Sequence, residues 1–476
     1  MPAPATFETF SAELSRLVAK FERELHEVKA AGYSEAKLRD DYLNLFFHAL
    51  GWDLQNRAGL IQQKREVEIE SRTNISGRTK RADYLFRTDG HDRFVCEAKK
   101  PREELGPRYA FQAKRYAWNM RLPLAVLTDF EEIKIYVVGG KARIGDGDLG
   151  LWKTWHFRQY PLIAREIWDL LSRDCVAGGV IDAELDKLPK RPAGGRGRAK
   201  QQWLIKPDRT RALDTDFLEF LDAARRDLAS DILRHNDRAE TLEGTRLNEA
   251  VQCILDRILF IRICEDRDID TGPRLQTIVE KWRRNWDRED GAKHRQDTLR
   301  LREDPAADPI QNSESKIQNS APPPLWRAVV AHFRALDRRP PSTVPFFNGN
   351  LFKPHFSEEI LLGDTWLAEF IAELSDDESP YLFNVIRVEI LGSVYERFLG
   401  KVVRPHGRGV TIEETPEVRK AGGVYYTPRY IVDYIVEQTV GRQLDAIAGI
   451  GAEKENAPQA ERRALSSAGA PPAVPG

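Results

Sequence analysis

The spacing of apolar residues changes character along the first 160 residues. Between residues 7 and 50, apolar side chains recur every three or four positions, which predicts two helices, the second ending at Gly51. From residue 66 onward the period falls to two, and helical spacing returns only over residues 109–119. Strands are predicted at 66–70, 81–86, 93–99, 122–128, 133–138 and 151–157. This order of elements predicts one α/β domain over residues 1–160.

The pattern then becomes mainly helical. Residues 161–213 include a basic, Pro/Gly-rich segment and are interpreted as a linker. Residues 214–400 carry helical spacing, interrupted at 303–324 by a low-complexity insertion in which Ile-Gln-Asn-Ser occurs twice. Residues 401–445 contain a helical run, Arg429 to Val440. The Ala/Pro/Gly-rich residues 446–476 are expected to form a disordered C-terminal tail.

Composition narrows the class of protein. The chain has 476 residues, of which 41% are hydrophobic and 31% charged, so it is neither a disordered chain nor a membrane protein. It has no signal peptide pattern and no CxxC pair among its four cysteines. We therefore expect a cytoplasmic protein that does not contact membranes.

Charge is unevenly distributed although the formal net charge is −1. Residues 76–121 carry twelve Lys/Arg against six Asp/Glu, a local net charge of +6. Residues 187–211 carry nine Lys/Arg against one acidic residue. Such stretches either follow a nucleic acid backbone or form an ordinary solvated surface.

A hairpin predicted around an Asp-Gly turn carries the candidate chemistry. If Thr88 and Asp92 close a three-residue loop, Asp83 lies directly opposite Glu97. Because side chains alternate along a strand, Glu97 and Lys99 then share a face with Asp83. A two-residue loop would move Glu97 out of register with Asp83, so the predicted geometry depends on the turn.

Two opposed carboxylates repel each other unless a cation or a proton lies between them. Mg²⁺, which prefers oxygen ligands, would relieve the repulsion between Asp83 and Glu97, activate a bound water and stabilise a phosphoryl oxygen. Lys99 could orient or deprotonate that water, or offset the growing negative charge. The plainer interpretation is a solvated sheet face, since Glu-x-Lys occurs at four other places. In either case these side chains would face solvent or metal, and alanine variants would fold.

The sequences Arg81-Ala-Asp-Tyr, Phe94-Val-Cys-Glu-Ala-Lys99 and Gln112-Ala-Lys-Arg-Tyr116 resemble the PD-(D/E)xK nuclease fold. The variant is the one found at the N-terminus of type I restriction subunits and of fused, type IIG restriction–modification enzymes. The resemblance covers about residues 30–140. It implies a mixed central sheet flanked by helices, with Asp83 and Glu97 as metal ligands and Lys99 as a catalytic residue.

The resemblance also implies supporting residues. Gln112 and Tyr116 match the family's QxxxY motif and share one helix face, from which they can reach the site or DNA. Glu35 or Asp41 is the candidate for an acidic residue that the family often supplies from its first helix. Residue 82 is Ala where the family name has Pro. Contacts with double-stranded DNA are expected from the nearby basic residues Arg78, Lys80, Arg81, Lys114 and Arg115.

The segment Gly422-Gly-Val-Tyr-Tyr-Thr-Pro428 resembles the first cofactor motif of N6-adenine DNA methyltransferases. Residues 401–445 are therefore expected to be the truncated start of such a domain. The family's next motifs, a DPACGSG-type loop and NPPY, do not occur in these 476 residues. Tyr426, Thr427 and Pro428 would then contact S-adenosylmethionine only if a separate polypeptide completes the domain.

Three interpretations remain open at this level. The first is a restriction–modification protein, a type II-like, site-specific deoxyribonuclease that uses Mg²⁺ and carries an incomplete methyltransferase portion. The second is a non-catalytic DNA-binding remnant, or a subunit that pairs with a separate methyltransferase polypeptide. The third is an adenine-specific DNA methyltransferase, against which the missing motifs count.

Overall fold

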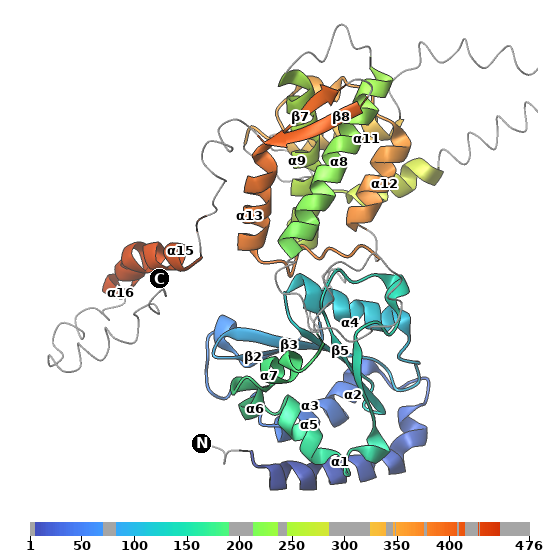
Figure 1. Ribbon diagram of the computed structural model, residues 1–476, viewed down its shortest axis with the longest axis vertical. Helices are drawn as coiled ribbons and strands as arrows, with labels where there is room; N and C mark the ends of the chain where they lie inside the picture. Colours follow the sequence, from blue (N-terminus) through green and yellow to red (C-terminus); the bar gives the residue numbers. More distant parts are fainter. Residues whose placement is uncertain are drawn as a thin grey trace, which may run out of the picture.

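The computed structural model separates the chain into a sheet unit (residues 5–189) and a helical unit (residues 213–414) (Figure 1). The helices α15 and α16 lie apart from both units. The structure describes residues 5–69, 82–189, 213–236, 245–284, 324–338, 346–347, 349–375, 378–406, 409–414, 427 and 429–447. Within these residues no helix is both long enough and apolar enough to cross a membrane.

The described part of the sheet unit contains a mixed six-stranded sheet in which the strands follow one another in chain order. Its strands are β1 (Val67–Ile69), β2 (Tyr84–Thr88), β3 (His91–Ala98), β4 (Leu124–Thr128), β5 (Glu132–Val137) and β6 (Leu151–His156). Only β3 and β4 pair in parallel, while the other neighbours are antiparallel. The connection between β3 and β4 runs through α4 (Pro107–Asn119), as parallel pairing requires. Each of the strands predicted from the period-two pattern is present.

Helices cover both faces of the sheet (Figure 1). One face packs on α1 (Phe7–Val28), α3 (Asn44–Ala49) and α5 (Ala164–Leu171) in a core that includes Phe86 and Phe94. The opposite face packs under α4. Shorter elements complete the unit: α2 (Glu35–Leu38), η1 (Arg39–Leu43), η2 (Gln62–Lys64), η3 (Ile144–Asp146), η4 (Phe157–Gln159), α6 (Arg173–Ala177) and α7 (Val180–Asp186).

The second predicted helix is divided in the structure. A π-helical turn, η1, separates α2 from α3, and Gly51 follows with a positive φ of 93°. Hydrophobic spacing alone does not reveal this change, because a π turn inserts one residue without removing the apolar stripe. The inserted turn directs Arg39 toward the sheet, where its guanidinium is buried.

The helical unit contains α8 (Leu213–His235), α9 (Thr245–Asp266), α11 (Pro324–Leu336), η6 (Phe356–Glu358), α12 (Asp364–Ser375) and α13 (Val388–Leu399). It also contains a hairpin that the sequence pattern did not predict, β7 (Lys401–His406) and β8 (Gly409–Glu414). Although the predicted helical spacing runs through residue 400, the chain from 381 to 387 is not helical, and α13 begins at Val388. Residues 161–189 of the expected linker form α5, α6 and α7, which pack in the core of the sheet unit, so the linker prediction is wrong for this part. Residues 190–212 and nearly all of the low-complexity insertion lie outside the described residues.

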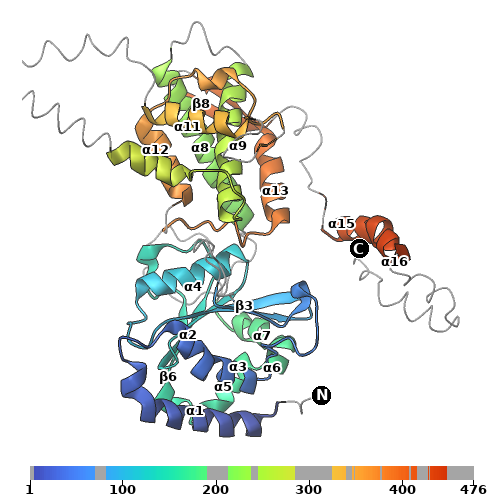
Figure 2. The ribbon, with the colours of Figure 1, turned by 180° about the vertical axis from the view of Figure 1, so that it is seen from behind.

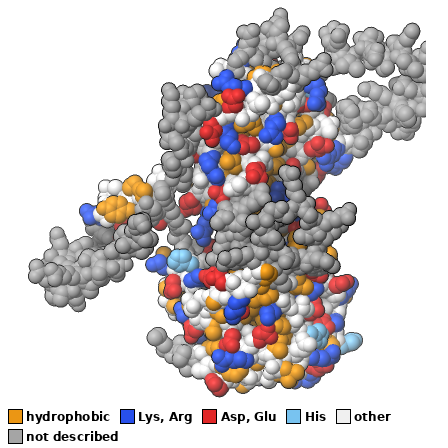
Figure 3. Space-filling view, viewed as in Figure 1, with side chains coloured by type: hydrophobic (Ala, Val, Ile, Leu, Met, Phe, Trp, Pro, Cys, Tyr) orange, Lys and Arg blue, Asp and Glu red, His pale blue; other side chains and the backbone are white. Residues whose placement is uncertain are grey.

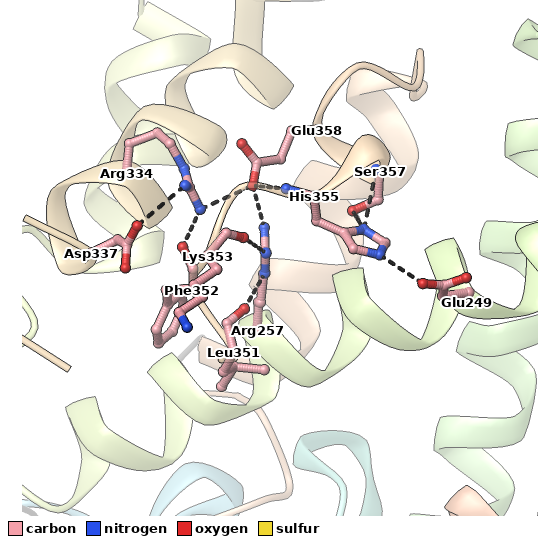
Figure 4. A network of polar contacts seen from close by, with 10 residues as sticks. All are labelled: Glu249, Arg257, Arg334, Asp337, Leu351, Phe352, Lys353, His355, Ser357 and Glu358. Atoms are coloured by element: carbon pink, nitrogen blue, oxygen red, sulfur yellow. Dashed lines mark hydrogen bonds and ion pairs between the residues drawn. The ribbon is translucent and has the colours of Figure 1, made fainter. Parts of the chain in front are cut away.

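A buried arginine holds one long loop against the helical unit (Figure 4). Arg257 is 1% exposed and donates to the carbonyls of Leu351 and Lys353, at 2.7 and 2.6 Å. It also forms a 2.8 Å ion pair with Glu358, which in turn receives Arg334 at 2.9 Å. Arg257 thus fixes the loop that carries Leu351 and Lys353 to α9, and we interpret the network as structural.

The helix α4 lies between the sheet and the helical unit in both views (Figures 1 and 2). Its last residue, Asn119, is fully buried and donates to the Pro380 carbonyl at 2.7 Å. The same amide accepts the Leu382 N–H at 3.0 Å. At the edge of the interface, Arg387 pairs with Asp92 of β3 at 2.9 Å. Buried polar contacts and a shared apolar core therefore fix α4 to the helical unit.

The chain described after β8 forms α15 (Arg429–Val436), η7 (Glu437–Gly441) and α16 (Arg442–Ile447). The helical run expected over residues 429–440 is thus present, with a π turn in its second half. Apolar side chains are exposed along it, including Ile431, Tyr434 and Ile435 (Figure 3). The expected tail, apart from residues 446 and 447, lies outside the described residues.

Candidate active site

The β2–β3 hairpin places Asp83 opposite Glu97, but it does so by a different route from the predicted one. Thr88 pairs with His91, so the loop has two residues and not three. Both loop residues, Asp89 and Gly90, have positive φ, which is typical of a type I′ turn. A register shift beyond Phe86 compensates for the shorter loop. The predicted turn is therefore wrong.

The register shift is a β-bulge. Tyr84 pairs with Cys96 and Phe86 with Phe94, whereas Arg87 pairs with Asp92. One residue of β3 therefore has no partner on β2. The pairs on the side of the bulge away from the turn have the predicted register. Continued by one pair, that register sets position 83 against position 97.

Asp83 is held by two donors at the start of β2. Its Oδ1 accepts Arg39 Nη1 at 2.6 Å, and its Oδ2 accepts the Ala98 N–H at 2.8 Å. Asp83 is only 3% exposed. Burial raises the pKa of the Asp83 carboxyl, and the Ala98 N–H, the Arg39 charge and the Lys99 charge oppose that shift.

Glu97 lies on the same sheet face, beneath α4. One of its oxygens, Oε1, accepts Lys99 Nζ at 2.7 Å and also accepts the side-chain amide of Gln112. Its other oxygen, Oε2, is buried and has no hydrogen-bond partner among the described residues. Burial, and then the neighbouring Asp83 carboxylate, raise the pKa of Glu97 to about 8. An unpartnered buried carboxylate oxygen next to a second carboxylate has the chemistry of a cation ligand.

Lys99 completes the cluster. Burial alone would lower the pKa of Lys99, but the Glu97, Glu35 and Asp83 carboxylates together outweigh burial, and the pKa lies above its ordinary value. The ammonium also lies 5.1 Å from the centre of the Tyr109 ring, on the first turn of α4. The ammonium is therefore held between a carboxylate and an aromatic face.

The carboxylate oxygens of Asp83 and Glu97 are ligands of the kind that a magnesium ion prefers. The described residues hold no group of three or more His, Cys, Asp or Glu side chains arranged to hold a metal. Mg²⁺ usually keeps several waters and binds through one or two carboxylates, which Asp83 and Glu97 supply. Either carboxylate would also gain a partner that relieves the repulsion between them.

The structure separates the two acidic candidates of the first helices. The Glu35 carboxyl, at the start of α2, lies close to the Asp83 carboxyl, and its charge contributes to the raised pKa of Glu97. Asp41 instead accepts the hydroxyl of Tyr33 at 2.9 Å, away from this cluster. Glu35 therefore joins the candidate site and Asp41 does not.

The two positions of the QxxxY motif behave differently. Gln112 contacts Glu97 directly. Tyr116 is 2% exposed and packs in the core that α4 shares with the helical unit. From this position Tyr116 supports the helix that carries Gln112, and Gln112 is the one that reaches the carboxylates.

The expected DNA-contacting residues are distributed unevenly. Arg78, Lys80 and Arg81 lie outside the described residues. Lys114 is 5% exposed and donates inward, to the carbonyls of the loop before β6, so it is not presented to a phosphate. Arg115 is half-buried and donates to the Tyr381 carbonyl at 3.3 Å, at the interface between the units.

Arg39 is the site residue that the sequence pattern missed. Its pairing with Asp83 depends on the π turn that begins at residue 39, and neither a motif nor a periodicity marks that turn. Nothing local to Arg39 distinguishes it from a solvated helix residue. Only the tertiary contact between η1 and Asp83, the residue before β2, gives it a role.

The expectation that Asp83 and Lys99 face solvent is wrong, since they are 3% and 7% exposed. This burial changes the expected result of alanine substitution.

Asp83→Ala should lower the free energy of unfolding by about 3–5 kcal/mol, because it leaves Arg39 buried without its partner. Chemical denaturation measures this change. The double variant Arg39→Met/Asp83→Ala should regain part of the loss, and an additive loss would contradict the ion-pair explanation.

The candidate cofactor residues at the other end of the chain are mostly not described. Tyr426 and Pro428 lie outside the described residues, and Thr427 is exposed just before α15. No pocket can be built from Thr427 alone.

The fold and the site together define a carboxylate–carboxylate–lysine site on a mixed α/β sheet, attached to a helical unit. The chain is 26% identical over 434 residues to the type II restriction enzyme and methyltransferase RM.Eco57I of Escherichia coli. The similarity covers 90% of this chain but 37% of that enzyme, so the chain spans little more than a third of the relative's length. No protein-family model and no solved structure matches the chain.

Proposed function

We propose that this chain is the nuclease-bearing part of a restriction–modification protein, and that residues 1–160 form a PD-(D/E)xK domain that hydrolyses double-stranded DNA with Mg²⁺. The observation that carries the proposal is the buried, unpartnered Oε2 of Glu97 beside Asp83 and Lys99. The similarity to a restriction enzyme and methyltransferase supports the same function.

Each residue has a defined task in this proposal. Asp83 and Glu97 would hold the ion, which when bound lowers the pKa of a water and stabilises negative charge on a phosphoryl oxygen. Lys99 offsets the charge that develops on the phosphate. Gln112 orients Glu97 through its amide, and Arg39 orients Asp83. Arg39 and Gln112 are positioning residues because they contact the carboxylates and not the reacting atoms.

The later segments are assigned by the same proposal. The predicted boundaries of 161–213 for a linker, 214–400 for a helical connector and 401–445 for the start of an adenine-N6 methyltransferase domain need adjustment. The nuclease unit would extend through α7, the helical connector would include β7 and β8, and the methyltransferase portion would begin after Glu414. S-adenosylmethionine would bind only where further polypeptide supplies the motifs that these 476 residues lack. The apolar side chains exposed on α15 are consistent with such a partner.

Removal of divalent metal provides the direct test of the proposed function. The purified chain should cleave long, unmethylated duplex DNA in Mg²⁺ and leave it intact in EDTA, because neither Asp83 nor Glu97 activates water without a cation. Gel electrophoresis of the products measures this, with Mg²⁺ added back after EDTA as the control. Cleavage that persists in EDTA would exclude the metal-dependent site, and DNA binding without any cleavage would favour the non-catalytic subunit.

A further inference from the structure

A cavity of about 290 Å³ lies between α4 and the helical unit, next to the candidate active site. Gln112 both lines this cavity and contacts Glu97, so the cavity and the carboxylates share one side chain. Three of its lining residues are Arg108, Arg115 and Arg274. The first two come from α4, and Arg274 comes from the chain that follows α9 in the helical unit.

The charges that line this cavity favour an anion. A fourth arginine, Arg262, is already paired with Asp266 at 2.6 Å. Apart from that pair, the acidic residue lining the cavity is Glu378, so arginine outnumbers acid three to one. Arg108 is exposed and Arg274 is half-buried, which leaves both able to reach a bound group.

The backbone at the N-terminal end of α4 also favours an anion in this cavity. The first turn of α4 lines the cavity through Arg108 and Tyr109. The cap residue is Gly106, which has no side chain to accept a hydrogen bond from that turn, and Pro107 follows at the first helical position. The start of a 13-residue helix carries partial positive charge, which suits a phosphate, although the Tyr109 and Ala110 N–H groups already donate to the Gly106 carbonyl.

We infer that this cavity binds a phosphodiester group of the DNA strand that passes the carboxylate site, with Arg108 and Arg274 as its main contacts. The inference rests on the proposed function and deepens it, because it gives the helical unit a share of the nuclease's DNA contacts. A polynucleotide lying across Asp83 and Glu97 must place neighbouring phosphates near Gln112 and the arginines beside it. A free nucleotide offers the same phosphate chemistry, and the experiment distinguishes the two.

The test compares two double variants of the full chain in EDTA, where the DNA is not cut. Arg108→Gln/Arg274→Gln removes the proposed contacts. Arg226→Gln/Arg283→Gln removes the same charge from exposed positions that do not line the cavity. Binding of a labelled duplex of mixed sequence is measured by fluorescence anisotropy from low to physiological salt. Circular dichroism and thermal melting check that both variants are folded.

The cavity variant should bind the duplex about tenfold more weakly at low salt. Its slope of log Kd against log salt should be smaller by about 1, as expected for one lost phosphate contact. The control variant should stay within about twofold of the parent. Equal losses in both variants would show a general charge effect and overturn the inference.

Two further outcomes separate this inference from the proposed function. If the parent binds DNA and the cavity variant binds it equally well, the inference fails while the proposed function stands. If the parent does not bind DNA even at low salt, both fail. Calorimetry with ATP is the second experiment. If ATP binds the parent but not Arg108→Gln/Arg274→Gln, and both bind DNA equally, the cavity binds a free nucleotide and the inference fails.

Discussion

Asp83→Asn and Lys99→Gln should each lower Mg²⁺-dependent DNA cleavage by at least about 10²-fold, because each removes a charge that acts on the metal or on the transition state. Conservative substitutions are needed because both side chains are buried, and alanine would also remove the ion-pair partner of Arg39 or of Glu97. Cleavage rates on duplex DNA, with protein stability measured beside them, provide the comparison.

The chain contains a matched control for this experiment. Glu27-Val-Lys29 repeats the Glu-x-Lys spacing at the C-terminal end of α1, far from the hairpin in sequence, and Lys29 is 43% exposed in a pair with Glu131. Lys29→Gln should leave cleavage unchanged, since an exposed pair contributes little to stability and nothing to the site. Parental cleavage by a folded Asp83→Asn or Lys99→Gln variant would show that the site is assigned to the wrong residues.

The second large effect concerns methylation. A polypeptide of these 476 residues should transfer no methyl group from S-adenosylmethionine to DNA on its own. Adenine methylation requires a flipped base and the cofactor in one pocket. Small-ligand pockets usually bury most of the ligand, whereas Tyr434 and Ile435 on α15 are 64% and 52% exposed. A few amides at the start of one helix cannot enclose a cofactor.

Incorporation of labelled methyl groups into adenine-containing duplex measures this activity. The chain would be assayed alone and then with a polypeptide that carries the DPACGSG-type loop and the NPPY motif. Label in the DNA only with both components would support a divided methyltransferase. Label with this chain alone would mean that the methyltransferase interpretation, set aside for lack of those motifs, is the right one.

Local patterning predicted much of the fold. The change of period at residue 66, and the return of helical spacing at 109–119, depend on residues that are neighbours in sequence, so they indicate strands and a helix before any packing is known. The same alternation places Glu97 and Lys99 on one face. The hairpin β7–β8 escaped prediction, because its residues 401–414 contain Pro405 and many charges and lack a clear apolar alternation.

The sequence by itself determined that Glu97 and Lys99 share one strand face, because side chains alternate along a strand, and it offered Asp83 as their neighbour only through an assumed turn. The tertiary structure decided how they meet and what surrounds them. A two-residue turn and a bulge together restored the register, a π turn brought in Arg39, and α4 brought in Gln112 while directing Lys114 inward. The physical reason is that burial and partner choice depend on which elements pack against each other, and those contacts join residues distant in the sequence.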